Sequence, residues 1–204
     1  MPELPEVEAA RRLLEAHCVG KKVAEVHAQE SGGHARDGQF DNIVFDDAEI
    51  SEETVTAALA GKTLEAVHRK GKQLWLELSS PLHLLAHFGM TGAFVIEGDR
   101  PLEYQEFKVH DEAWPPRFTK LELVFRGASA SAPTRLAFCD PRRLGRLRLR
   151  ADPLTQEPWS ALAPDPLLEP VSVARCVAAL GAKGCTIKSL LLDQAALVSG
   201  VGNW

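Results

Sequence analysis

The sequence has no apolar run long enough to cross a membrane, and its amino terminus has no basic stretch leading into an apolar one. We therefore expect neither a membrane span nor a secretory signal. The four cysteines are widely spaced and form no C-x-x-C pair: Cys18, Cys139, Cys176 and Cys185. This spacing indicates neither a zinc site nor a disulfide framework, and it favours buried, reduced thiols in an intracellular protein.

The chain also lacks a net positive charge, since 28 aspartates and glutamates outnumber 23 lysines and arginines and leave a net charge of −5. This balance counts against nucleic-acid binding, which favours a basic surface. Arginines are nevertheless concentrated in one segment: Arg142, Arg143, Arg146, Arg148 and Arg150. A basic face on an acidic protein can still hold DNA locally, so charge alone does not exclude that partner.

The chain begins with an acidic segment that contains two prolines, MPELPEVE at residues 1–8. Removal of Met1 would make Pro2 the amino terminus. A free α-amine titrates near pH ~8 and a lysine near ~10.4, so more of the α-amine is unprotonated at neutral pH. Such an amine can attack a carbon atom and form an imine-type intermediate. Glu3 lies beside it in the chain and could move protons.

The same segment is also typical of the start of an amphipathic helix. Pro5 fits the first turn, Glu6 and Glu8 suit its positive end, and apolar residues recur at helical spacing as far as Leu14. We predict this helix from about Leu4 to His17. From the residues alone, a nucleophilic terminus and an ordinary capped helix both stay open.

Short segments with alternating or clustered apolar residues follow. We predict strands at Val23–His27, Ile43–Phe45, Thr63–Arg69, Gln73–Ser79, Leu82–Phe88, Ala93–Glu97, Thr119–Phe125, Arg135–Cys139 and Gly145–Leu149. The leucines at 74, 76 and 78 predict a buried face. Ser51 is expected to cap a short helix, Glu52–Ala60. So many short strands indicate a β-sandwich or barrel.

The last quarter of the chain has a different character. Ala151–Pro170 contains five prolines, which predict a linker or an irregular crossing between domains. We predict two helices after it, Ser172–Leu180 ending near Gly181, and Thr186–Asp193. The glycine-rich segment 200–203, GVGN, predicts a turn.

Four further segments carry residues of functional interest. They are the basic turn HRKGK at 68–72, HFGMTG at 87–92, DPRRLG at 140–145, and the pair formed by TIK at 186–188 and GVGN at 200–203. Each also has an ordinary interpretation: a solvated turn, a glycine turn with a core methionine, a basic hairpin, and two helices joined by a turn.

Residues 1–8 and these four segments, in this order, resemble the formamidopyrimidine-DNA glycosylases, base-excision repair enzymes that remove oxidised purines. The resemblance reaches from Met1 to Trp204 and is strong in five places. The segments WPP at 114–116 and LLLDQ at 190–194 are most similar to plant and fungal members.

The resemblance implies catalytic roles for four residues. Pro2 would attack the sugar carbon of the damaged nucleotide, and Glu3 would be the general acid and base. Glu6 would support them, and Lys72 would reach the lesion and its neighbouring phosphate. No metal or other cofactor is expected.

The DNA-binding residues that the resemblance implies are Met90, Arg142, Arg143, Leu144, Lys188 and Asn203. Met90 would fill the space left by a rotated base, and Arg142 would face the orphaned partner base. Leu144 departs from the family, which has an intercalating phenylalanine there, so insertion is expected to be weaker. Lys188 and Asn203 would bind phosphates flanking the lesion.

The implied fold is α+β: an N-terminal β-sandwich with flanking helices, followed by a partial helix–two-turn–helix domain. We expect the catalytic domain at 1–150, a proline-rich linker at 151–170 and the partial DNA-binding domain at 171–204. The family continues with a second helix of that motif and a β-hairpin finger, so the chain is expected to be truncated at its carboxyl end.

The expected function is that of a bifunctional DNA glycosylase and AP lyase on 8-oxoguanine and formamidopyrimidines, acting on damaged double-stranded DNA as a monomer. One alternative is a truncated member that binds damaged DNA but cuts weakly or not at all. A β-sandwich with a structural or protein-binding role and no DNA contact is a third. The plant-like features favour a nucleus, and otherwise a cytoplasm.

Overall fold

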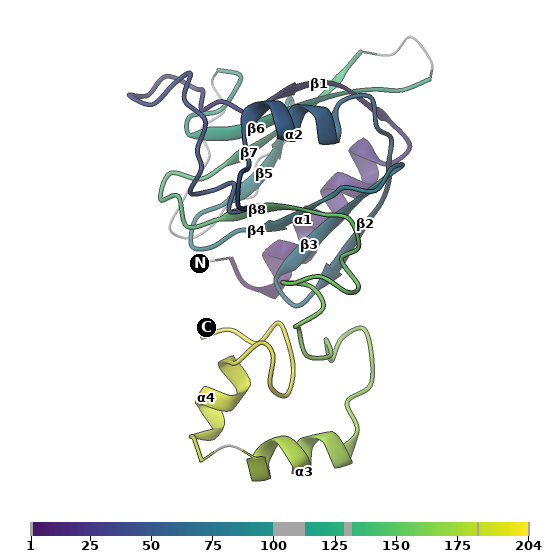
Figure 1. Ribbon diagram of the computed structural model, residues 1–204, viewed down its shortest axis with the longest axis vertical. Helices are drawn as coiled ribbons and strands as arrows, with labels where there is room; N and C mark the ends of the chain where they lie inside the picture. Colours follow the sequence, from purple (N-terminus) through teal and green to yellow (C-terminus); the bar gives the residue numbers. More distant parts are fainter. Residues whose placement is uncertain (1, 100–112, 129–131, 183, 204) are drawn as a thin grey trace.

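The computed structural model describes residues 2–99, 113–128, 132–182 and 184–203, so Met1 and Trp204 lie outside the described residues. Figure 1 shows a larger part that contains the strands and the first two helices, and a smaller part that contains the last two. The elements are α1 (Leu4–Cys18), β1 (Lys22–His27), α2 (Glu52–Leu59), β2 (Leu64–Lys70), β3 (Gln73–Leu78), β4 (His83–His87), β5 (Ala93–Ile96), β6 (Thr119–Arg126), β7 (Thr134–Cys139), β8 (Arg146–Arg150), α3 (Val173–Ala182) and α4 (Ile187–Leu192).

Within the described residues, the strands form two four-stranded antiparallel sheets, ordered β1-β6-β7-β5 and β2-β3-β4-β8. Apolar side chains from both sheets share one large core, to which Leu74 and Leu76 of β3 and Phe138 of β7 belong. Buried and half-buried residues alternate along β3, as the sequence predicts. The predicted α+β class with a β-sandwich is confirmed.

Helix α1 flanks the sandwich and carries the amino terminus. Its start is fixed by the Glu6 carboxylate, which accepts a hydrogen bond of 2.9 Å from the backbone N–H of Glu3. This hydrogen bond satisfies the backbone N–H of Glu3, which has no partner within the helix. Val7, Ala10 and Leu14 are buried along one side. The helix therefore packs on the core, and Pro2 and Glu3 lie just before its first residue, Leu4.

The prediction of a strand at Ile43–Phe45 is wrong. Two backbone amides there, those of Ile43 and Val44, donate to one oxygen of the Asp41 side chain at 3.1 and 3.3 Å. The segment is consequently a turn, and only Phe45 forms an isolated bridge, with Leu147. An aspartate that captures nearby amides competes with strand pairing in this way.

The helix predicted to end near Gly181 does so, since α3 ends at Ala182. The expectation for the cysteines needs correction. Only Cys18 and Cys139 are buried, whereas Cys176 is partly exposed and Cys185 is exposed. Burial raises the pKa of both buried thiols to about 12, so they are unreactive. No helix among the described residues has the length and apolar character that crossing a membrane requires.

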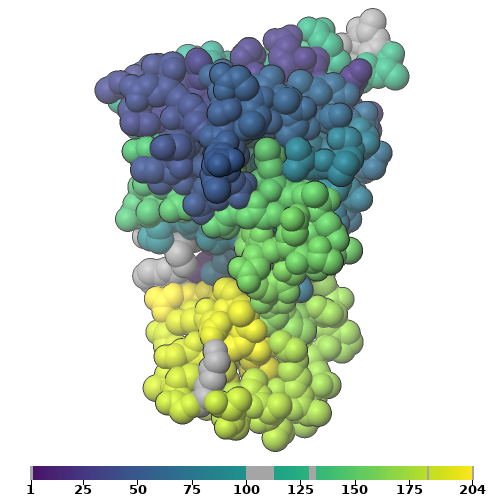
Figure 2. Space-filling view, viewed as in Figure 1, coloured from purple at the N-terminus to yellow at the C-terminus, as the bar shows by residue number. Residues whose placement is uncertain are grey.

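The segment 151–170 has no helix or strand, yet parts of it pack firmly. The indole of Trp159 is buried and lies edge-on to that of Trp75 in β3, with ring centroids 5.5 Å apart. Ala163 and Asp165 are also buried. In the space-filling view of Figure 2 this segment runs down the side of the sandwich into the smaller part, which packs against the end of the larger one.

A buried ion pair joins the two parts. The guanidinium of Arg69, at the end of β2, contacts the carboxylate of Asp165, and both side chains are almost completely buried. Asp165 also accepts the backbone N–H of Gly71 at 2.9 Å, and Arg69 donates to the carbonyl of Gly71 at 3.0 Å. A third contact of Arg69 reaches Glu8 in α1 at 3.1 Å. Helix α1, the turn after β2 and the segment after β8 therefore meet at one guanidinium.

Asp165→Ala is expected to lower the free energy of unfolding by about 3 kcal/mol, because removal of one member of a buried pair leaves the other charge uncompensated. Urea unfolding measures the loss. Asp46→Ala is the matched control, since the Asp46–Arg148 pair lies nearer the surface and such pairs contribute about 1 kcal/mol or less. Equal losses in the two variants would contradict a stabilising role for the junction.

Candidate active site

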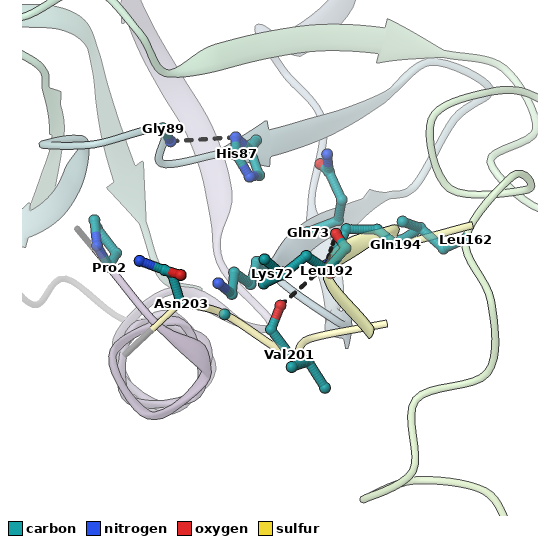
Figure 3. Close-up of a pocket in the computed structure, with 11 residues that line it drawn as sticks. Pro2, Lys72, Gln73, His87, Gly89, Leu162, Leu192, Gln194, Val201 and Asn203 are labelled. Carbon is teal, nitrogen blue, oxygen red and sulfur yellow. Dashed lines mark hydrogen bonds between the residues drawn. The ribbon is translucent and has the colours of Figure 1, made fainter. Parts of the chain in front are cut away.

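A cavity of about 230 Å³ lies where the amino terminus, the sandwich and the last turn of the chain meet. Figure 3 shows Pro2 and the Asn203 amide side by side, with the Lys72 ammonium pointing toward them and His87 and Gly89 opposite. The residues that line the cavity are Pro2, Lys72, Gln73, His87, Gly89, Leu162, Leu192, Gln194, Val201, Gly202 and Asn203.

The amino-terminal residues face this cavity rather than the core. Pro2 is buried and lines the cavity. The carboxylate of Glu3 forms an ion pair with the Lys72 ammonium, and both side chains are largely enclosed. The other Glu3 oxygen, Oε1, is buried and has no hydrogen-bond partner among the described residues. A buried unpaired carboxylate oxygen is costly, and catalytic sites are one place where such groups occur.

The carboxyl-terminal turn reaches the amino terminus because it contains glycines. A Cβ atom added at Gly202 would lie 1.6 Å from a carboxylate oxygen of Glu3. One added at Gly200, where φ is +97°, would lie 2.4 Å from the Leu4 side chain. Only glycine allows backbone to approach this closely. The GVGN turn therefore places Asn203 beside Pro2.

Gln194 holds this turn in place, a role that the sequence did not suggest. Its amide nitrogen donates to the carbonyls of Leu192 and Val201 at 2.9 and 3.0 Å. Its amide oxygen accepts the backbone N–H of Gly200 at 2.8 Å. Both ends of the side chain are thus engaged, and the turn is tied to the end of α4. The LLLDQ segment is similar to that of plant and fungal members, but its spacing does not show which groups the Gln194 side chain would contact.

His87 is a second cavity residue whose role the sequence did not suggest. Its Nδ1 accepts the backbone N–H of Gly89 at 3.2 Å. Burial, together with the nearby charges of Lys72, Arg148 and Arg146, lowers the pKa of His87 from 6.5 to about 4. The ring is therefore neutral at pH 7, with Nδ1 as acceptor and Nε2 carrying the proton.

The methionine turn and the arginine loop are held against each other. Asp140 accepts the hydroxyl of Thr91 at 2.6 Å through one oxygen and the backbone N–H of Gly145 at 2.6 Å through the other. A Cβ atom added at Gly89 would lie 2.3 Å from the carbonyl oxygen of Leu144. The two segments, far apart in sequence, therefore form one surface next to the cavity.

The predicted residues divide into two groups. Pro2, Lys72 and Asn203 converge on the cavity, with Glu3 beside them. The others lie outside its lining: Glu6 at the helix start, Met90 partly buried, Arg142 and Leu144 exposed, Arg143 in an ion pair, and Lys188 exposed on α4. In the part of the chain that the structure describes, no three side chains are placed to hold a metal ion.

The basic face expected at residues 142–150 is mostly neutralised. Arg143 pairs with Asp41, Arg150 pairs with Asp47, and Asp46 pairs with Arg148 and lies 3.5 Å from Arg146. Among the five arginines, only Arg142 has no ion pair with a described residue. The aspartates come from a segment about a hundred positions earlier, so the sequence showed the arginines but not their partners.

This geometry can be compared with that of known proteins. The sequence model of the formamidopyrimidine-DNA glycosylase N-terminal domain matches residues 1–147. The chain belongs to the formamidopyrimidine-DNA glycosylase family. A formamidopyrimidine-DNA glycosylase from Arabidopsis thaliana is 42% identical over 205 residues, which is all of this chain and 48% of the relative. One from Rhodopseudomonas palustris is 32% identical, with all of this chain and 64% of the relative covered.

Solved structures of the family have the same fold. The MutM (Fpg) protein from Thermus thermophilus superposes with a TM-score of 0.69 at 31% identity, covering 99% of this chain and 60% of that one. The Lactococcus lactis enzyme bound to DNA containing an AP site superposes with a TM-score of 0.68 at 25% identity, with 99% and 66% covered. The chain thus spans between about half and two thirds of the length of these family members.

The stability of the folded chain is expected to fall as the pH drops from 6.5 to about 4. Unfolded His87 takes up a proton below 6.5, whereas the folded residue does so only near 4, so protonation favours unfolding between these values. The loss amounts to at most about 3 kcal/mol. Urea unfolding between pH 4.5 and 7 measures it.

His87→Gln should reduce this dependence of stability on pH, although not completely, because burial also lowers the pKa of His83.

Glu8 provides an internal control below this pH range. Burial would raise the pKa of Glu8, but hydrogen bonds from Arg11, Arg12 and Arg69 outweigh it and lower the pKa to about 2. The stability that Glu8 contributes is therefore lost as the pH falls from 4.5 toward 2, in both proteins. If stability depends on pH above 4.5 as steeply in His87→Gln as in the wild type, His87 is not the cause of that dependence.

Proposed function

We propose that this chain is a DNA glycosylase of base-excision repair that removes oxidised purines and then cleaves the strand as an AP lyase. The observation that carries the proposal is the placement of Pro2 in a cavity beside the paired carboxylate and ammonium of Glu3 and Lys72. Membership of the formamidopyrimidine-DNA glycosylase family supports the substrate class. Removal of Met1 is required, because only a terminal proline has an amine with a free electron pair.

In the proposed reaction the amine of Pro2 attacks the anomeric carbon of the damaged nucleotide. The bond between sugar and base breaks, and the base leaves with a proton. Opening of the sugar ring gives an iminium ion that links Pro2 to the sugar. Loss of a proton from the adjacent carbon expels the 3′ phosphate, and a second elimination expels the 5′ phosphate.

Glu3 carries the proton transfers in this scheme. Its unpaired oxygen Oε1 is the available acceptor, while the other oxygen is engaged by Lys72. Lys72 keeps the carboxylate in place and adds positive charge where a phosphate would lie, next to the Asn203 amide. Neutral His87 would donate a hydrogen bond from Nε2 to the same phosphate. In this scheme the nucleophile and the donors line the cavity, and the base, Glu3, lies next to it through its pair with Lys72.

The adjoining surface is proposed to hold the duplex. Met90 and Leu144 would fill the gap left by the rotated nucleotide, and Arg142 would face the orphaned base. Lys188 would contact a flanking phosphate from α4. The Lactococcus lactis relative was crystallised with DNA containing an AP site, which supports damaged DNA as the partner.

Reductive trapping tests the covalent step. When the chain is incubated with a duplex containing 8-oxoguanine and with borohydride, a covalent protein–DNA adduct is expected on a denaturing gel. Pro2→Gly should reduce the yield at least tenfold, and an amino-terminal extension should abolish it, because both remove the secondary amine. Mass spectrometry of the adduct should place the link on the first residue of a chain that starts at Pro2. A link to a lysine would contradict the mechanism.

A second candidate function is binding of damaged DNA without cleavage. The chain spans 48% of the Arabidopsis relative and 64% of the Rhodopseudomonas relative, so binding and cleavage are tested separately on these 204 residues. Binding of the lesion duplex with a steep dependence on salt, together with no adduct in the trap, would identify this function. Absence of both binding and adduct would exclude either activity for these 204 residues.

Leu144→Phe should raise the affinity for a duplex that contains an abasic-site analogue by about tenfold, since stacking of an aromatic ring on a base contributes ~1–3 kcal/mol. Leu144 is 40% exposed, so a larger ring can extend toward solvent without disturbing the core. Fluorescence anisotropy with labelled duplex measures the change. The undamaged duplex is the control, because it offers no gap to fill. An equal gain for both duplexes, or no gain, would contradict insertion of this residue.

A further inference from the structure

The loop between β7 and β8 contains a residue in an unusual backbone conformation. Arg143 has a φ of 56°, in the left-handed region that residues with a Cβ atom seldom occupy. Such a conformation persists only where the surroundings impose it, and it changes the direction of the chain at that point. The side chain of Arg143 shows what imposes it here.

Arg143 is bound by a buried carboxylate. Its guanidinium donates to both oxygens of Asp41, from Nε at 2.7 Å and from Nη2 at 2.8 Å. A two-pronged contact of this kind fixes the plane of the guanidinium as well as its position. Asp41 has no exposed surface. The tip of Arg143 is therefore directed into the protein.

The carboxylate is in turn anchored by its surroundings. The ammonium of Lys120, also buried, lies 3.2 Å from Asp41 and pairs with Glu30 as well. Burial would raise the pKa of Asp41, but hydrogen bonds from Arg143 and Lys120 outweigh it and hold the pKa well below its usual value. Asp41 thus stays ionised and presents a fixed negative charge to the loop.

The consequence falls on the two neighbours of Arg143. Asp140 fixes both ends of the loop through the backbone N–H groups of Arg142 and Gly145. With the side chain between them turned inward, the side chains of Arg142 and Leu144 are left exposed. The anchored side chain of Arg143 and the two bonds to Asp140 therefore fix the backbone from which Arg142 and Leu144 extend.

We propose that Arg143, anchored by Asp41, is a positioning residue that presents Arg142 and Leu144 to the duplex and makes no DNA contact of its own. The part of this inference that concerns DNA rests on the proposed function. The part that concerns the loop does not, and it has its own measurement.

Amide hydrogen exchange tests the loop without DNA. Arg143→Gln should speed exchange at residues 142–145 by about tenfold, which corresponds to ~1.4 kcal/mol of easier local opening. Arg148→Gln is the matched control, since Arg148 also pairs with an aspartate, Asp46, but does not belong to the loop. Exchange in the loop should be unchanged in this control. Equal exchange in wild type and Arg143→Gln would overturn the positioning role.

Salt dependence of binding to an abasic-analogue duplex tests whether Arg143 touches the DNA. Arg143→Gln should weaken binding about tenfold while leaving the slope of log K against log salt unchanged, since removal of one phosphate-binding charge would reduce that slope by about 0.9. Arg142→Gln should cost about tenfold in wild type and less than about twofold in the Arg143→Gln background, because the loop no longer presents it. A reduced slope with additive losses would show that Arg143 binds DNA directly.

Asp41→Asn gives opposite expectations for the two roles. If Arg143 positions the loop, loss of its anchor weakens binding to about the same extent as Arg143→Gln. If Arg143 binds phosphate, its release from Asp41 strengthens binding. Should Asp41→Asn fail to fold, the Arg143 variants still decide the question. Failure of the wild type to bind the duplex would overturn the proposed function, and the exchange measurement would still accept or reject the positioning role.

Discussion

A single guanidinium, that of Arg69, connects the parts of the chain between which the cavity forms. It contacts Glu8 in α1, the carbonyl of Gly71 and the carboxylate of Asp165. Because Lys72 follows Gly71 directly, the contact that docks the smaller part also fixes the backbone from which Lys72 extends. A buried charge of this kind tolerates few alternative arrangements, since any movement that separates the pair leaves two uncompensated ions. The position of the last turn relative to Pro2 is therefore set by the same interaction.

Close backbone packing then determines the electrostatics of the cavity. Glycines at 200 and 202 bring the last turn against Leu4 and Glu3, where side chains of any size would keep it away. The approach removes water from the Glu3 carboxylate, and Lys72 compensates only one of its oxygens. The remaining oxygen is buried and has no partner among the described residues, so its burial is costly unless a bound molecule donates a hydrogen bond to it. In the proposed reaction, this oxygen of Glu3 accepts a proton from the substrate.

The helices and strands were predictable because their signals are local. Periodicity placed α1 and the strands of both sheets to within a few residues, and it failed at 43–45, where the Asp41 side chain captures the amides. Contacts between distant segments had no such signal. The pairing of Arg148 with Asp46, or of Arg69 with Asp165, joins residues about a hundred positions apart. The convergence of Pro2, Lys72 and Asn203 was expected only from the family resemblance, because no spacing along the chain encodes it.

The paired arginines clarify how an acidic protein could hold DNA selectively. If the arginines at 142–150 were free, their combined charge would attract any duplex, damaged or not. Aspartates at 41, 46 and 47 neutralise most of that charge, and Asp41 also turns Arg143 inward. What remains outward at the loop is one guanidinium and one apolar side chain, Arg142 and Leu144, next to Met90. If the proposed function is right, these groups make few favourable contacts with an intact DNA duplex and more with a duplex that has a displaced nucleotide. The ion pairs inside the protein therefore weaken attraction to the DNA backbone and leave binding more dependent on the lesion.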